Sequence, residues 1–185
     1  MAFSAVLDAS VLYPLPLRDT LLCVAETGLY EPCWSKRILD EAANSLIADG
    51  RATEAQARHM LDAMLGAFDA ASMPHEVIAR LEPAMTNEAK DRHVLATAVA
   101  GDAQAIVTLN LKHFPDDACE PFAVEPLHPD VFLLDLYGLD PQATYNAVER
   151  QAAALTRPPM TIDELLDRLG ATVPDFAQAL QAHPR

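Results

Sequence analysis

Two short apolar runs, each followed within two residues by an acidic or amide side chain, limit the folds that this chain can adopt. Phe3–Leu7 ends at Asp8, and Ala105–Thr108 ends two residues before Asn110. Each run is too short for a helix and is typical of a buried strand of a parallel sheet. Because helical patterns fill the sequence between them, we expect an α/β/α sandwich with a central parallel sheet.

The helices that separate these strands carry their own start and stop signals. Glycine follows three apolar-periodic stretches, and a capping-box pattern begins another at Thr53. Trp34 stands at the start of one of these helices, where we expect it to be a packing anchor. The expected helices are Leu17–Thr27, Ser35–Asp49, a helix from Thr53 to about Phe68, and Lys90–Ala100.

A change in composition near residues 126–130 predicts a boundary. The strand-like run Phe122–Val124 precedes a stretch with two prolines, Glu125–Pro129, after which every segment has a helical pattern. We therefore expect a main domain over residues 1–128 and a small all-helical C-terminal extension over residues 129–185. The helices of the extension are expected at about Pro129–Tyr137, Pro141–Thr156, Thr161–Leu169 and Pro174–Ala182.

The charge of the chain excludes one class of function. Asp and Glu number 27 against 13 Lys and Arg, which gives a formal net charge of −14. A protein of this charge cannot coat nucleic acid or an anionic membrane through a broad basic surface, but it can hold metal ions through carboxylates. Three scattered cysteines, no basic leader and no long apolar run predict a protein of the reducing cytoplasm.

Acidic and amide side chains stand where such a fold places its ligands, beyond the carboxyl ends of the strands. Asp8 and Asn110 follow the two predicted strands, and Asp91 opens a helix. Glu41 lies near the apolar edge of its helix, whereas Asp40 turns further toward solvent.

Carboxylates that meet in a cleft repel one another unless they are protonated or bind cations. Oxygen ligands favour Mg²⁺ or Mn²⁺, which suit the cleavage of phosphodiesters. Taken one at a time, Asp8 could instead be a turn residue, Asp91 a helix cap and Glu41 part of a solvated face. The spacing alone does not decide between these interpretations.

Four motifs, in order along residues 3–126, resemble the PIN domain family. Val6–Leu12 is similar to the opening of that domain, and Ile38–Glu41 to the segment that bears its glutamate. Asp91–Ala98 (DRHVLATA) resembles the helix with its second aspartate, and Ile106–Pro115 its last strand and following loop. The resemblance implies an α/β sandwich with Mg²⁺-dependent ribonuclease activity. With the helical tail, it implies a VapC-type toxin of a bacterial toxin–antitoxin pair.

Carried over by position, the resemblance implies that Asp8, Glu41 and Asp91 are ligands of Mg²⁺ or Mn²⁺. Asn110 stands where many members have a fourth aspartate, so it would assist catalysis without adding charge, and one ion is the more economical expectation. Ser10 and Thr108 are candidate hydroxyl partners of the carboxylates or, equally, turn residues.

Basic residues close to these ligands predict a basic rim around the site. Lys36 and Arg37 precede Glu41, Arg92 adjoins Asp91, and Lys112 follows Asn110. Arg92 and Lys112 are candidates for contact with substrate, although Arg92 also suits a surface ion pair. His93 and His113 lack the spacing of zinc ligands and are expected at the polar rim.

The function expected from sequence is therefore a metal-dependent endoribonuclease, the toxin of a VapBC-type pair. Its partners would be RNA, a cognate antitoxin protein and a second copy in a homodimer, with no membrane. Two alternatives stay open, a PIN-like interaction module with weak or no catalysis and a metal-dependent phosphatase.

Overall fold

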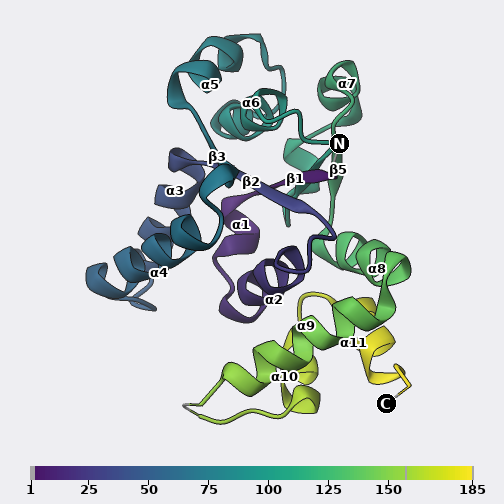
Figure 1. Cartoon of the computed structure of the whole chain (residues 1–185). Coiled ribbons are helices and arrows are strands. Elements are labelled where there is room, and N and C mark those ends of the chain that lie inside the picture. Colours follow the sequence, from purple (N-terminus) through teal and green to yellow (C-terminus); the bar gives the residue numbers. More distant parts are fainter. Residues whose placement is uncertain (1–2, 157, 185) are drawn as a thin grey trace.

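The computed structural model describes residues 3–156 and 158–184, which form a parallel sheet covered by helices (Figure 1). The five strands of this sheet run in the order β3-β2-β1-β4-β5. They are β1 (Ser4–Leu7), β2 (Glu31–Ser35), β3 (Ser72–Met73), β4 (Ala105–Val107) and β5 (Glu125–Leu127). The expected fold class, an α/β/α sandwich with a parallel sheet followed by C-terminal helices, is confirmed.

Helices cover both faces of the sheet (Figure 1). Those before β5 are α1 (Ala9–Leu12), α2 (Leu15–Ala25), α3 (Lys36–Ala48), α4 (Glu54–Ala67), α5 (His75–Leu81), α6 (Arg92–Ala100) and α7 (Asp116–Cys119). The C-terminal helices are α8 (Pro129–Leu139), α9 (Pro141–Ala154), α10 (Ile162–Leu169) and α11 (Pro174–Gln181). Local signals set several of their starts. Ser35 caps α3, and capping boxes begin α4 at Thr53 and α10 at Thr161.

The order of the strands reverses at β1, which makes the carboxyl end of that strand a topological switch point of the sheet. β1 pairs with β2 on one side and with β4 on the other, so that Val6 lies between Cys33 and Ile106. Val6 and Ile106 are fully buried, and Cys33 is nearly so. In open parallel sheets, ligands bind where the connections diverge to opposite sides, here beyond the ends of β1 and β4.

Two strands, β2 and β3, were not expected from the sequence, and β5 begins later than the run Phe122–Val124 that was expected to form a strand. Trp34 lies inside β2 and not at the start of a helix, although it is fully buried as expected. Phe122 ends a short 3₁₀ turn (Glu120–Phe122), Ala123 has a φ of 54°, and the strand begins only at Glu125. Pro126 is tolerated there because β5 is an edge strand.

The C-terminal helices pack against α2 through α9 and α10. Gln151 of α9 reaches α2, where its amide donates to the carbonyl of Pro16 (3.1 Å) and accepts from Thr20 (2.8 Å). The buried carboxylate of Asp130 accepts the backbone N–H groups of Asp175 and Phe176 and so holds the start of α11. Within the described part of the chain, no helix is both long and apolar enough to cross a bilayer.

Candidate functional site

Asp8 lies directly after β1 and is held by two hydroxyl groups. The residue is 6% exposed, and its Oδ2 accepts hydrogen bonds from Ser10 Oγ (2.6 Å) and Thr108 Oγ1 (2.7 Å). Ser10 Oγ in turn accepts the N–H of Leu109 (3.0 Å). These bonds join the end of β1 to the end of β4 and fix the Asp8 carboxylate at the carboxyl edge of the sheet.

Asn110 follows β4 at the same edge of the sheet. Its backbone N–H donates to Thr108 Oγ1 (3.0 Å), so Thr108 links the backbone of Asn110 to the carboxylate of Asp8. Lys112, two residues further on, is exposed. The structure thus places Asp8, Ser10, Thr108 and Asn110 together, as the positions of the two strands predict.

Asp91 occupies the N-cap position of α6 but does not act as a cap. Its side chain makes no cap hydrogen bond, and its Oδ2 lies 2.7 Å from Nδ1 of His113. Burial raises the pKa of Asp91, and the charge of Asp8 raises it further, against the lowering effects of Lys90 and His113. The two carboxylates therefore lie within electrostatic range of each other, and their charges repel.

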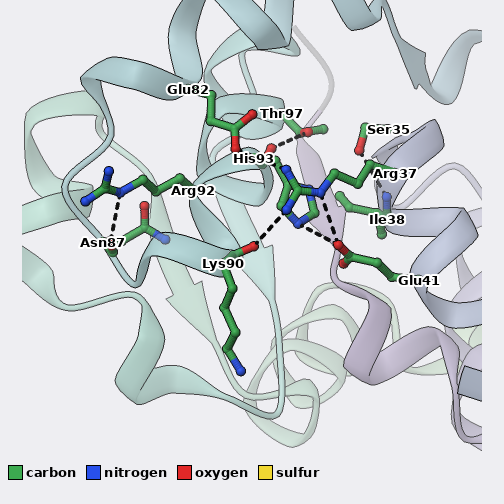
Figure 2. Close-up of polar contacts among 10 residues, drawn as sticks. All are labelled: Ser35, Arg37, Ile38, Glu41, Glu82, Asn87, Lys90, Arg92, His93 and Thr97. Carbon is green, nitrogen blue, oxygen red and sulfur yellow. Dashed lines mark hydrogen bonds and ion pairs between the residues drawn. The ribbon is translucent and has the colours of Figure 1, made fainter.

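Glu41 projects from α3 toward α6, where Arg37 and His93 contact the same oxygen (Figure 2). Its Oε1 lies 3.2 Å from Arg37 Nε and 3.2 Å from His93 Nε2. Burial acts to raise the pKa of Glu41, but the close contact and charge of His93, and then the hydrogen bond and charge of Arg37, bring it below its ordinary value. Glu41 is accordingly charged at neutral pH.

Arg37 ties the helix of Glu41 to the segment that carries Asp91. Its Nη1 lies 3.1 Å from Glu82 Oε1, and its Nη2 donates to the backbone carbonyl of Lys90 (3.4 Å) (Figure 2). Lys90 precedes Asp91 in a short 3₁₀ turn (Ala89–Asp91). Glu41 therefore lies beside the Asp91 segment, although its carboxylate is turned to Arg37 and His93.

The three carboxylates share one arrangement. The hydrogen bonds and ion pairs of the described residues engage Oδ2 of Asp8, Oε1 of Glu41 and Oδ2 of Asp91, and so leave the second oxygen of each to another ligand. Oxygen donors of this kind suit Mg²⁺ or Mn²⁺, and a cation would relieve the repulsion between Asp8 and Asp91. Within residues 3–156 and 158–184, however, no three His, Cys, Asp or Glu side chains lie close enough to form a ready-made metal site. The donors fit such an ion chemically, and Glu41 would have to approach the Asp8–Asp91 pair to share it.

The two histidines differ from the polar rim residues expected from the sequence. His93 is buried, with 1% of its surface exposed, and the His113 side chain is largely covered, with 14% exposed. The available signal was the place of His93 on the apolar face of α6, since a buried imidazole requires a polar partner. The identity of that partner depends on where the fold places α3 relative to α6, which the local sequence does not encode.

Most of the basic side chains expected to form a rim around the site instead contact other groups of the protein. Lys36 lies 2.6 Å from Asp40, and Arg37 is bound by Glu41 and Glu82. Arg92 donates through Nε to the backbone carbonyl of Asn87 (3.3 Å), so this contact is not the surface ion pair considered from sequence (Figure 2).

Comparison with known proteins gives matches to both parts of the chain. A family model described as "PIN domain" matches residues 4–112, and a model described as "VapC50 C-terminal domain" matches residues 129–182. A protein of Mycobacterium tuberculosis (strain ATCC 25618 / H37Rv) named "Putative ribonuclease VapC50" is 53% identical over 94 residues, which are 51% of this chain and 56% of that protein. The match thus spans about half the length of that relative. No solved structure matches the chain with significance.

Proposed function

The chain belongs to the PIN domain family, and from this premise we propose that it is a metal-dependent endoribonuclease, the toxin of a VapBC-type toxin–antitoxin pair. The observation that carries the proposal is the arrangement of Asp8, Glu41 and Asp91, each with one oxygen held by the protein and one left for a ligand. The name of the M. tuberculosis relative supports RNA as the substrate.

In this proposal, Asp8, Glu41 and Asp91 hold Mg²⁺ or Mn²⁺ through their second oxygens. Asn110 would contribute an uncharged amide oxygen from the end of β4. Such an ion, when bound, lowers the pKa of water and offsets charge on a phosphodiester.

In this proposal, the remaining residues of the site either hold the Asp8 carboxylate in place or contact the RNA. Ser10 and Thr108 hold Asp8 at the carboxyl edge of the sheet through two short hydrogen bonds. Lys112 is exposed beside Asn110, where its ammonium group is available to an RNA phosphate. Arg92 is held at Nε by Asn87, and its terminal amino groups are our candidates for a second phosphate contact.

Cleavage of RNA by the purified full chain tests the proposal. We expect cleavage that requires Mg²⁺ or Mn²⁺ and that is lost in Asp8→Asn and in Asp91→Asn, while Asp40→Asn, on the exposed side of α3, retains it. Cleavage that survives both of the first two substitutions would overturn the assignment of these ligands. Hydrolysis of a small chromogenic phosphate ester without cleavage of RNA would instead identify a phosphatase, and no Mn²⁺ binding by calorimetry would identify an interaction module.

The groove between α2 and α4 supports an antitoxin as partner. A cavity of about 390 Å³ there is lined by apolar side chains that include Leu22, Met60 and Phe68, and its polar lining residues include Arg18, Asp19, Glu26 and His59. Arg18 pairs with Asp19 (3.3 Å), so Glu26 is the acid of this lining to which a basic residue at the margin of an amphipathic helix could pair. Co-purification with the product of an adjacent small gene, lost when Met60→Asp is introduced, tests this partner.

We further propose that residues 1–128 form the nuclease domain, that residues 129–185 form a helical extension, and that the protein is a homodimer. The last strand of the sheet ends at Leu127 and α8 begins at Pro129, which supports the division. Light scattering of the purified chain measures the oligomeric state, and a monomeric mass would refute the homodimer.

A further inference from the structure

We infer that His93 and His113 are positioning residues of the proposed site. Each would hold one oxygen of a carboxylate, Glu41 or Asp91, and thereby direct the other oxygen to the metal ion. The inference rests on the proposed function, and it concerns two residues that their spacing in the sequence placed only at the polar rim.

His93 reaches Glu41 from the buried face of α6. Its imidazole is 1% exposed, and Nε2 lies 3.2 Å from Glu41 Oε1. The contact is close but not a well-aligned hydrogen bond, and Nδ1 has no hydrogen-bond partner among the described residues. Glu41 is thus the polar group to which this buried ring is turned (Figure 2).

His113 reaches Asp91 from the loop after β4. Its Nδ1 lies 2.7 Å from Asp91 Oδ2, again close but not well aligned. The backbone fixes the ring in this place, because the carbonyl of His113 accepts the N–H of Glu88 (3.2 Å) and its N–H donates to the carbonyl of Asn110 (2.9 Å). His113 therefore connects the Asn110 loop to the segment that carries Asp91.

The two contacts use different nitrogens of the ring. A bare ring nitrogen beside a carboxylate oxygen would be repelled, so the contacting nitrogen must carry a proton, Nε2 in His93 and Nδ1 in His113. Groups that orient the ligands of a metal change its affinity by about 10–100-fold when they are removed. Arg37 contacts the same oxygen of Glu41, but its side chain is 49% exposed, and an exposed ion pair of this kind contributes little.

The difference between Nε2 and Nδ1 gives a specific test. The amide nitrogen of glutamine stands near the position of a histidine Nε2, and that of asparagine near Nδ1. If the histidines position carboxylates, His93→Gln should retain Mn²⁺ affinity better than His93→Asn. The order should reverse at the second position, where His113→Asn should retain more affinity than His113→Gln.

Isothermal titration calorimetry with Mn²⁺ on the full chain measures these affinities, and thermal unfolding followed by circular dichroism verifies that each variant is folded. We expect His93→Leu to weaken Mn²⁺ binding about 10–100-fold in the wild-type chain. In a chain that already carries Glu41→Gln, the same His93→Leu substitution should weaken Mn²⁺ binding much less. Gln151→Leu, a change of a buried polar side chain far from the carboxylates, is the matched control and should leave Mn²⁺ affinity unchanged.

The outcomes separate the inference from the proposed function. If the wild-type chain binds no Mn²⁺, the proposed function fails and the inference fails with it. If the wild type binds Mn²⁺ but Asn and Gln are equivalent at both positions, the histidines only fill space and the inference alone is wrong. The inference is also wrong if His93→Leu weakens Mn²⁺ binding equally in the wild-type chain and in the Glu41→Gln chain. The amide variants keep the test decisive even if His93→Leu does not fold.

Discussion

Replacing Thr108 with valine removes one hydroxyl from the centre of the candidate site with little change of shape. Thr108 is fully buried, and its hydroxyl both donates to Asp8 Oδ2 (2.7 Å) and accepts the N–H of Asn110 (3.0 Å). A hydrogen bond to a charged group contributes about 1.5–3 kcal/mol to stability. Asp8 keeps its bond from Ser10, and Asn110 is a partly exposed residue, so we expect Thr108→Val to lower the free energy of unfolding by about 2 kcal/mol.

Thr97→Val provides a matched control for this substitution. Thr97 is also fully buried, and its hydroxyl donates to the carbonyl of His93 (2.7 Å), four residues earlier in the same helix. That carbonyl already accepts a backbone hydrogen bond within the helix, so it keeps a partner when the hydroxyl is removed. We expect Thr97→Val to cost less than about 1 kcal/mol.

Urea denaturation followed by circular dichroism, at neutral pH and without divalent ions, measures both free energies. The reasoning predicts that Thr108→Val is the more damaging change by about 1 kcal/mol or more. A cost for Thr108→Val no greater than that for Thr97→Val would mean that the hydroxyl does not hold the Asp8 carboxylate, and the description of the site at the end of β1 would be refuted.

Three further outcomes follow from the structure. Because the pKa of Asp91 is raised in the folded protein, its ionised form costs stability at neutral pH, and this cost is relieved as the pH falls through the folded pKa. Asp91→Asn should therefore raise the free energy of unfolding at neutral pH, and this gain should disappear at about pH 4. Urea denaturation at several pH values between these limits measures the gain. A gain that does not change with pH would contradict the raised pKa of Asp91 as its cause. A Cβ on Gly101 would stand 2.7 Å from Cys33 Sγ, so Gly101→Ala should lower the free energy of unfolding by about 1–3 kcal/mol in the same assay. Adding Cys33→Ala to this variant should recover part of the lost stability. Burial raises the pKa of Cys33 to about 12 and that of Cys119 to about 11, so iodoacetamide should alkylate both far more slowly in the native chain than in urea, as mass spectrometry would detect. Equal rates in the two states would show that these thiols are not buried.

Elements with local signals could be predicted from the sequence, and elements defined by their neighbours could not. The capping boxes at Thr53 and Thr161 involve residues three apart, and both helices begin where those residues indicate. β2 contains Pro32 and borders a helix, and β3 consists of two residues, so neither has the alternation that marks a strand. Their identity as strands arises from pairing with β1 and with each other.

The same distinction applies to the site. Asp8 and Asn110 could be anticipated because each follows a strand, and parallel strands end at one edge of a sheet. The contact between His93 and Glu41 joins residues 52 positions apart on two helices, and no pattern within either helix specifies it. A buried histidine indicates that some partner exists, and only the folded structure, which brings Glu41 of α3 to His93 of α6, shows which one.

The distribution of charge limits how a nuclease of this kind could hold RNA. The net charge of −14 leaves few cations, and the protein uses two of the five basic residues near the site, Lys36 and Arg37, in ion pairs with its own acids. Tight binding along a nucleic-acid backbone requires several phosphates to be neutralised. With Arg92 partly engaged, the exposed Lys90 and Lys112 are the cations left near the carboxylates among the described residues, which are too few for such a track. Affinity for RNA would therefore come mainly from the phosphate at the carboxylates and its bound ion, so that RNA which does not reach the carboxylates would be held weakly.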